Sequence, residues 1–90
     1  MNSVTFQVLH DTFIKLADNA YKASEDVDEL CNYFLGRCEA YESAADMIAS
    51  TARAYGMILT IKQSQRQLFV NELRREEAAS EAFEKEVYND

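Results

Sequence analysis

The chain has 90 residues, of which 48% are hydrophobic, and its 16 acidic and nine basic side chains give a net charge of −7. This apolar content is typical of a folded protein, and the length predicts one domain spanning residues 1–90. The acidic balance argues against direct binding to nucleic acid or to an anionic membrane surface. The start of the chain lacks a signal-peptide pattern, and no stretch approaches the roughly 20 apolar residues of a membrane span, so we expect a cytoplasmic protein.

The first segment, near residues 3–23, has the spacing of an amphipathic helix. Ser3 can cap its start. Apolar residues then recur every three or four positions: Phe6, Leu9, Phe13, Leu16 and Ala20. His10 lies beside this apolar face, where we expect a surface or hydrogen-bonded histidine rather than a ligand or a base.

A longer helix is predicted near residues 25–55, with Ser24 as its cap and acidic residues in its first turn. Its apolar seam is continuous over four heptads, as in a coiled coil, and consists of two columns. One column contains only small residues: Cys31, Cys38, Ala45 and Ala52. The other is bulky: Val27, Phe34, Tyr41, Ile48 and Tyr55. Small columns let a neighbouring helix approach closely, so we expect the seam to face protein along its length.

The length of this helix predicts an elongated or oligomeric molecule. About 30 residues span about 45 Å, whereas a compact chain of this size is about 30 Å across. The first helix is expected to cover about two-thirds of that length. We therefore predict a self-association or target-binding surface that includes the uncovered end, formed by Phe34, Tyr41, Ile48, Ala52 and Tyr55.

Two glycines interrupt the pattern. Gly56 is expected to end the second helix in a left-handed cap, with Met57 folding back on the helix end. The alternative is one straight rod through Gly56. Gly36 lies in mid-helix, where it is either a tolerated weak point or a site of bending or close backbone approach.

A third helix is predicted near residues 57–87, with an interruption at residues 63–67. Its apolar positions are Ile58, Ile61, Leu68, Phe69, Leu73, Ala79, Phe83 and Val87. Residues 57–61 are rich in β-branched side chains and could form a strand. Because no second strand is available to pair with them, we expect a helix there.

The sequence offers little material for catalysis or cofactor binding. Cys31 and Cys38 are seven residues apart on one helical face, too far for a disulfide within the helix, so we expect free thiols. The spacing of Asp26 with Glu29, and of Glu39 with Glu42, resembles the paired acidic motifs of all-helical nucleotide pyrophosphohydrolases, which implies Mg²⁺ binding. Glu29 and Glu39 fall on the outer side of the helix, so we expect solvated acids, no metal, no cofactor and no enzyme.

Basic residues could nevertheless bind an anion between subunits. The candidates for a phosphate-bearing ligand or nucleotide are Arg37, Arg53, Lys62 and Arg66. The acidic side chains of the second helix offer a different function, in which the protein imitates nucleic acid and blocks a DNA- or RNA-binding protein. This acidic set is Asp26, Asp28, Glu29, Glu39, Glu42 and Asp46.

Taken together, these patterns predict an elongated all-α bundle of three helices, a helical hairpin plus an N-terminal helix. We expect a homo-oligomer that binds another protein through the seam of residues 25–55, as an adaptor, chaperone-like or inhibitory factor. The nucleic-acid mimic and the small-ligand binder are the alternatives.

Overall fold

The computed structural model describes residues 2–88, and the side-chain surroundings of residues 2–82. It contains three α-helices, α1 (Ser3–Asp26), α2 (Cys31–Ala54) and α3 (Gln65–Tyr88), with a short 3₁₀ turn, η1, over Asp28–Leu30. The described part of the chain has no strand, so the predicted all-α class is confirmed. The boundaries differ from the predicted 3–23, 25–55 and 57–87.

Asn2, rather than Ser3, caps the start of α1. The side-chain oxygen of Asn2 accepts a hydrogen bond from the backbone N–H of Thr5 at 2.9 Å and another from the Thr5 hydroxyl at 3.0 Å. Ser3 is already the first helical residue. The cap therefore lies one residue earlier than predicted, and it satisfies an amide that the first turn leaves free.

Ser24 does not start the second helix as predicted, because it lies inside α1. It is buried, and its hydroxyl donates a hydrogen bond to the carbonyl oxygen of Tyr21 at 2.6 Å. Its position follows the spacing of the buried Ala17 and Ala20, so it extends the face that α1 packs on α2. The chain leaves the helix only at Val27, whose backbone is extended.

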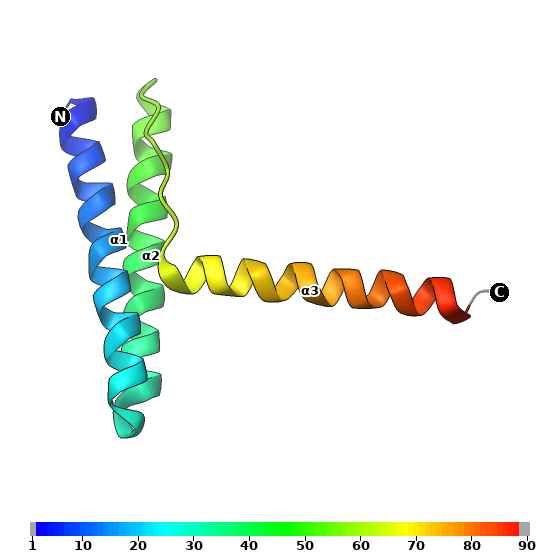
Figure 1. Cartoon of the computed structure of the whole chain (residues 1–90). Helices are drawn as coiled ribbons and strands as arrows, with labels where there is room; N and C mark the ends of the chain where they lie inside the picture. The colour runs from blue at the N-terminus through cyan, green and yellow to red at the C-terminus, as the bar shows by residue number, and fades with distance from the viewer. Residues whose placement is uncertain (1, 89–90) are drawn as a thin grey trace.

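Helices α1 and α2 form an antiparallel hairpin (Figure 1). Small side chains line the contact between them. Ala17 and Ala20 of α1 cluster with Cys38 of α2, while Ala45 and Ala52 farther along α2 are fully buried. The small column therefore packs against a neighbouring helix, as predicted, and that helix is α1. Each helix has 24 residues, so α1 runs along the whole of α2 and the predicted uncovered end is wrong.

The chain turns at Gly56 after α2. Gly56 has a φ of 78°, the N–H of Gly56 donates to the carbonyl of Arg53 at 2.9 Å, and the N–H of Met57 donates to that of Ala52 at 2.9 Å. These two bonds and the positive φ define a Schellman cap. Met57 packs against the cluster that contains Ala52. The predicted turn is confirmed, and the alternative of one straight rod is wrong.

Residues 57–64, which we call the strap, were predicted to be helical but have no regular secondary structure. Leu59 is buried against Phe6 of α1 and Ala52 of α2. The side-chain amide of Gln7 donates to the carbonyl oxygen of Thr60 at 2.9 Å and accepts from the Thr60 N–H at 2.8 Å. Gln7 thus supplies the pair of hydrogen bonds that a neighbouring strand would provide.

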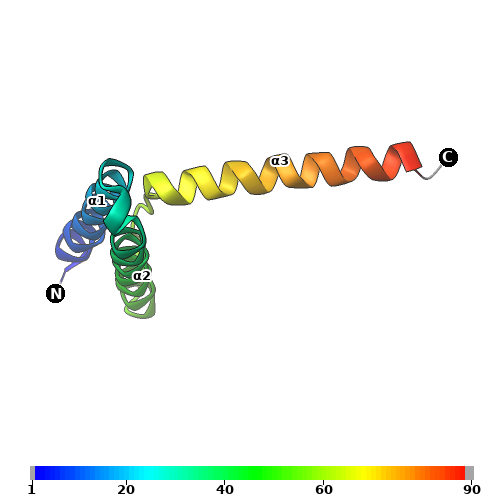
Figure 2. The ribbon, with the colours of Figure 1, turned by 90° about the horizontal axis from the view of Figure 1, so that it is seen from below.

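Helix α3 leaves the hairpin crosswise from the end of the strap (Figures 1 and 2). The radius of gyration is 17.3 Å and the principal extents are 59 × 39 × 13 Å, whereas a compact chain of this length would have a radius of gyration of about 12 Å. The predicted elongated shape is confirmed. The hairpin is formed by the first two helices, and a three-helix bundle is not confirmed because α3 extends away from them.

Candidate functional site

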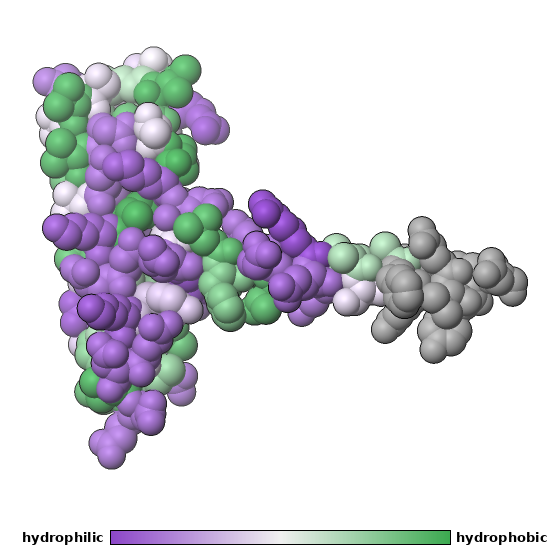
Figure 3. Space-filling model, in the orientation of Figure 1, coloured by the Kyte–Doolittle hydropathy of each residue, from purple (hydrophilic) through white to green (hydrophobic). Residues whose placement is uncertain are grey.

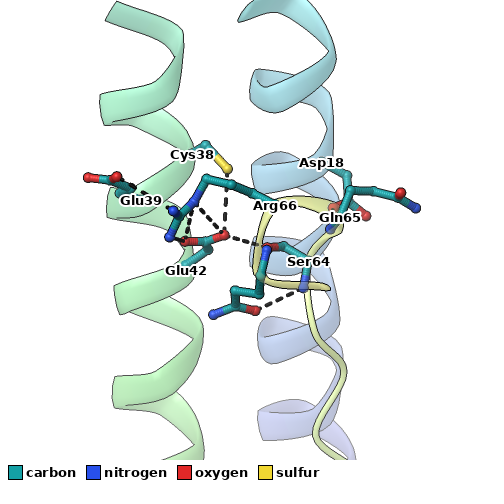
Figure 4. Close-up of polar contacts among 8 residues, drawn as sticks. Asp18, Cys38, Glu39, Glu42, Ser64, Gln65 and Arg66 are labelled. Carbon is teal, nitrogen blue, oxygen red and sulfur yellow. Dashed lines mark hydrogen bonds and ion pairs between the residues drawn. The ribbon is translucent and has the colours of Figure 1, made fainter. Parts of the chain in front are cut away.

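The start of α3 is tied to the hairpin by a buried carboxylate of α2. Arg66 Nη2 donates to Glu42 Oε1 at 2.6 Å, and Arg66 Nε lies 3.1 and 3.2 Å from the two carboxylate oxygens (Figure 4). Glu42 is only 4% exposed. A two-pronged pair of this kind fixes the direction of the guanidinium as well as its position.

Two further side chains donate to the same carboxylate. Ser64 is fully buried and donates its hydroxyl to Glu42 Oε2, and the Cys38 thiol donates to that oxygen at 3.7 Å (Figure 4). The backbone N–H of Gln65 donates to Asp18 Oδ1 of α1 at 2.7 Å. Both helices of the hairpin therefore hold the first turn of α3. We call this cluster the α3 junction: Asp18, Cys38, Glu42, Ser64, Gln65 and Arg66.

Ser64 also caps α3 together with Gln67. The N–H of Gln67 donates to Ser64 Oγ at 3.1 Å, and the N–H of Ser64 donates to Gln67 Oε1 at 2.9 Å. This reciprocal arrangement is a capping box. The predicted interruption at residues 63–67 is therefore the start of α3. A serine followed three residues later by glutamine, just before Leu68 and Phe69, is the sequence signature of such a helix start.

Two groups of the α3 junction, Arg66 and Cys38, have a raised pKa. The hydrogen bond with Glu42 raises the pKa of Arg66, so the guanidinium stays charged. Burial, reinforced by the charge of Glu42, raises the pKa of the Cys38 thiol from 9.0 to about 11. Cys38 is therefore a protonated thiol at neutral pH rather than a nucleophile. Both cysteines are free, as predicted, and Cys31 is partly exposed.

A second polar cluster lies beneath the strap. His10 is only 1% exposed, and its Nδ1 lies 3.2 Å from Asp11 Oδ1. Lys62 Nζ lies 3.3 Å from Asp11 Oδ2, and Gln7 donates to Asp11 Oδ1 at 2.9 Å. Burial opposes ionisation of Asp11, but the hydrogen bonds from His10, Gln7 and Lys62 outweigh it and hold the pKa of Asp11 below 3.8. The cluster anchors the middle of the strap.

Within a single chain the four predicted anion ligands do not converge, and a site formed between subunits stays a prediction. Arg66 is paired with Glu42, and its Nη1 lies 3.7 Å from Glu39, while Lys62 is paired with Asp11. Arg37 donates to the hydroxyl of Tyr41 at 2.6 Å and to that of Tyr33 at 3.3 Å, and it lies over both rings. Arg53 is exposed in the last turn of α2.

The predicted acidic sets are also divided. Glu42 is buried and paired with Arg66, so it is not part of an exposed acidic surface. Asp26 ends α1, whereas Asp28 and Glu29 lie in η1. Among the described residues, no group of three or more histidine, cysteine or acidic side chains is placed to hold a metal ion.

Four of the five predicted interface residues retain exposed surface. Phe34, Tyr41 and Ile48 are half-buried, and Tyr55 is 73% exposed. Ala52 is fully buried in the cluster with Phe6 and Leu59, so the strap and α1 take the place predicted for a partner.

The exposed side of the hairpin lies away from the strap, and we call it the open face. It consists of Leu9, Leu16 and Ala23 on α1 and Phe34, Tyr41 and Ile48 on α2. Leu16, Ala23, Phe34 and Tyr41 line one hollow, together with Arg37, and the rings of Phe13 and Tyr41 are 6.2 Å apart. The polar contacts of the strap instead go to Gln7 and Asp11 on the other side of α1. Ile48, at one end of the open face, also packs against the cluster of Phe6, Ala52 and Leu59.

Helix α3 carries a second exposed apolar surface, which we call the α3 stripe: Leu68, Phe69 and Leu73. These side chains are 52%, 54% and 42% exposed. Figure 3 shows hydrophobic residues gathered at the root of α3 and hydrophilic ones farther along it. Glu72, which lies between them, and Glu76, which follows Leu73 by three residues, are on the same side by helical spacing.

The chain matches no protein-family model, and comparison with curated proteins and with solved structures finds no significant match. Within the described residues, none of the helices combines the length and the apolar character needed to cross a membrane.

Proposed function

We propose that this chain is a small acidic protein-interaction module, acting as an adaptor, chaperone-like or inhibitory factor in the form of a homo-oligomer. Self-association uses the open face, and α3 engages another protein. The α3 junction has a structural role in this proposal, because its buried polar groups satisfy one another.

The exposure of the α3 stripe is the observation that supports this proposal. Helices in proteins owe most of their stability to packing of an apolar face. In α3, three large apolar side chains are about half exposed on a helix that joins the hairpin at its first turn (Figure 1). A partner that covers the stripe would supply the missing packing.

The geometry of α3 is that of a helix that docks into an apolar groove of its partner. Phe69 and Leu73 are four residues apart, so they lie one turn apart on one side of the helix, as in other helices that dock into apolar grooves. The α3 junction holds the first turn in place before binding, which lowers the entropic cost of association. Glu72, which lies between these anchors, and Glu76, which follows Leu73 by three residues, favour a groove with a basic rim.

Site-specific photo-crosslinking tests this function. A photoreactive phenylalanine analogue replaces Phe69 in the tagged full chain, expressed in the cells it comes from. The matched control carries the analogue at Ala78, which is exposed on the opposite side of α3. We expect a light-dependent adduct with one discrete protein from position 69 and none from position 78.

Identification of the adduct by mass spectrometry decides the outcome. Adducts that contain only a second copy of this chain, or the same set of proteins from both positions, would overturn the assignment of α3 as the target-binding element.

A further inference from the structure

The open face covers residues 9–23 of α1 and 34–48 of α2 without a carboxylate. The positions that complete it between the defining residues are Thr12, Phe13, Asn19, Ala20, Arg37 and Ala44. Although the chain carries 16 acidic residues, Arg37 is the one charged side chain among these α1 and α2 positions. Interface centres are depleted in charge and enriched in aromatic residues and arginine. A solvated face of so acidic a chain would not be expected to lack acids altogether.

The hairpin cannot bury this face by itself. Its two helices form a single layer, and the strap runs along one side of it (Figures 1 and 2). The side with the open face has no second layer. Stable helical domains place a second layer over such a face. The large side chains Phe34, Tyr41 and Ile48 remain only half-buried because the second layer is missing from the single chain.

The side of the hairpin that carries the open face is about as large as a standard interface. A helix of 24 residues is about 36 Å long, and two adjacent helices present a strip about 20 Å wide. The side of the hairpin that carries the open face therefore offers about 700 Å² per copy, against about 800 Å² per partner in an ordinary stable complex. A second hairpin of the same length covers this strip from end to end.

We infer that the open face binds a second copy of this chain about a two-fold axis, so that two hairpins form a four-helix bundle with the straps and the α3 helices on the outside. This inference rests on the proposed homo-oligomeric function and specifies its surface and stoichiometry. A two-fold contact uses the same patch on both copies and closes after two chains, so both α3 helices stay free for another protein.

Sedimentation equilibrium of the full chain tests the inference. The protein concentration runs from about 1 to about 100 μM, the range in which weak dimers dissociate. The expected mass is twice the 10.3 kDa of one chain. Leu9→Glu and Leu16→Glu each place a carboxylate on the open face, where both native leucines are 36% exposed. Each should raise the dimer Kd by at least about 100-fold, because two carboxylates would be buried without partners.

Leu73→Glu is the matched control, since Leu73 is 42% exposed on the α3 stripe. It should leave the dimer intact, and circular dichroism establishes that each variant keeps the helical content of the parent chain. A dimer that persists in both open-face variants but dissociates in Leu73→Glu would overturn the inference and leave the homo-oligomeric function standing. A parent chain that stays monomeric at every concentration would overturn both the two-fold dimer and the homo-oligomeric function. A tetramer would overturn the closure of the assembly after two chains.

Discussion

Cys38 couples the stability of the fold to pH through a single thiol. It is fully buried beside Glu42, and burial first, then the charge of that carboxylate, raises its pKa from 9.0 to about 11. In the unfolded chain the thiol would ionise near pH 9, whereas in the folded chain it keeps its proton. The folded state therefore binds the proton more tightly, and the contribution to stability is complete below pH 9 and is lost as the pH rises towards 11.

We predict that the free energy of unfolding of the parent chain, measured relative to that of Cys38→Ala, falls by about 2 kcal/mol between pH 8.5 and pH 11. Urea unfolding at a series of pH values measures it. Cys31→Ala keeps the buried thiol, so its stability should fall with pH in parallel with the parent chain. A constant difference between the parent chain and Cys38→Ala across this range would show that the thiol is not coupled to folding.

Among the elements, the two described glycines have opposite roles that their conformations explain. Gly56 has a left-handed backbone that a residue with a side chain adopts only with strain, whereas Gly36 lies in the middle of α2 at an ordinary helical position. A Cβ atom added at Gly36 would meet nothing within 4 Å in the single chain. The alternative of close backbone approach at Gly36 therefore has no support within the described chain.

Gly36→Ala should accordingly stabilise the chain by about 0.5 to 1 kcal/mol, and Gly56→Ala should destabilise it by about 1 kcal/mol or more. Thermal unfolding followed by circular dichroism measures both changes. A loss of stability in Gly36→Ala would mean that another backbone, outside the single chain, approaches that face of α2.

The heptad pattern predicted correctly which side of α2 packs against a neighbouring helix. It did not predict the contacts between residues that are far apart in the sequence. The small column of α2 faces α1 because any close-packed neighbour selects small residues, whichever helix supplies it. The strap was predicted as helix because its β-branched residues had no second strand. Gln7, more than 50 residues away, supplies the missing hydrogen bonds to Thr60 through its side chain, and no local pattern contains that information.

The α3 junction was only partly within reach of the sequence. The capping box of Ser64 and Gln67 is a local signal and could have placed the start of α3. The pairing of Glu42 with Arg66 could not be predicted, because it depends on where the strap ends relative to α2. On the heptad pattern, Glu42 reads as one of several exposed acids.

On the scale of the whole molecule, the α3 junction decides whether the hairpin and α3 behave as one body. Glu42→Gln removes the charge from the buried pair, so that Arg66 keeps a weaker hydrogen bond and Ser64 faces a neutral acceptor. Loss of a charge-assisted pair of this kind costs about 1 to 3 kcal/mol. Because the junction joins α3 to the rest of the chain, we expect this cost to fall on the attachment and the first turns of α3 rather than on the hairpin.

Hydrogen exchange followed by mass spectrometry measures this division. In Glu42→Gln, amides of residues 65–76 should exchange faster than in the parent chain, while those of α1 and α2 keep their protection. Glu39→Gln is the matched control, since the Glu39 side chain is 62% exposed and lies 3.7 Å from Arg66, and exposed pairs contribute about 0 to 1 kcal/mol. An equal loss of protection in all three helices of Glu42→Gln would show instead that hairpin and α3 unfold as one cooperative unit, with the buried carboxylate supporting the whole fold.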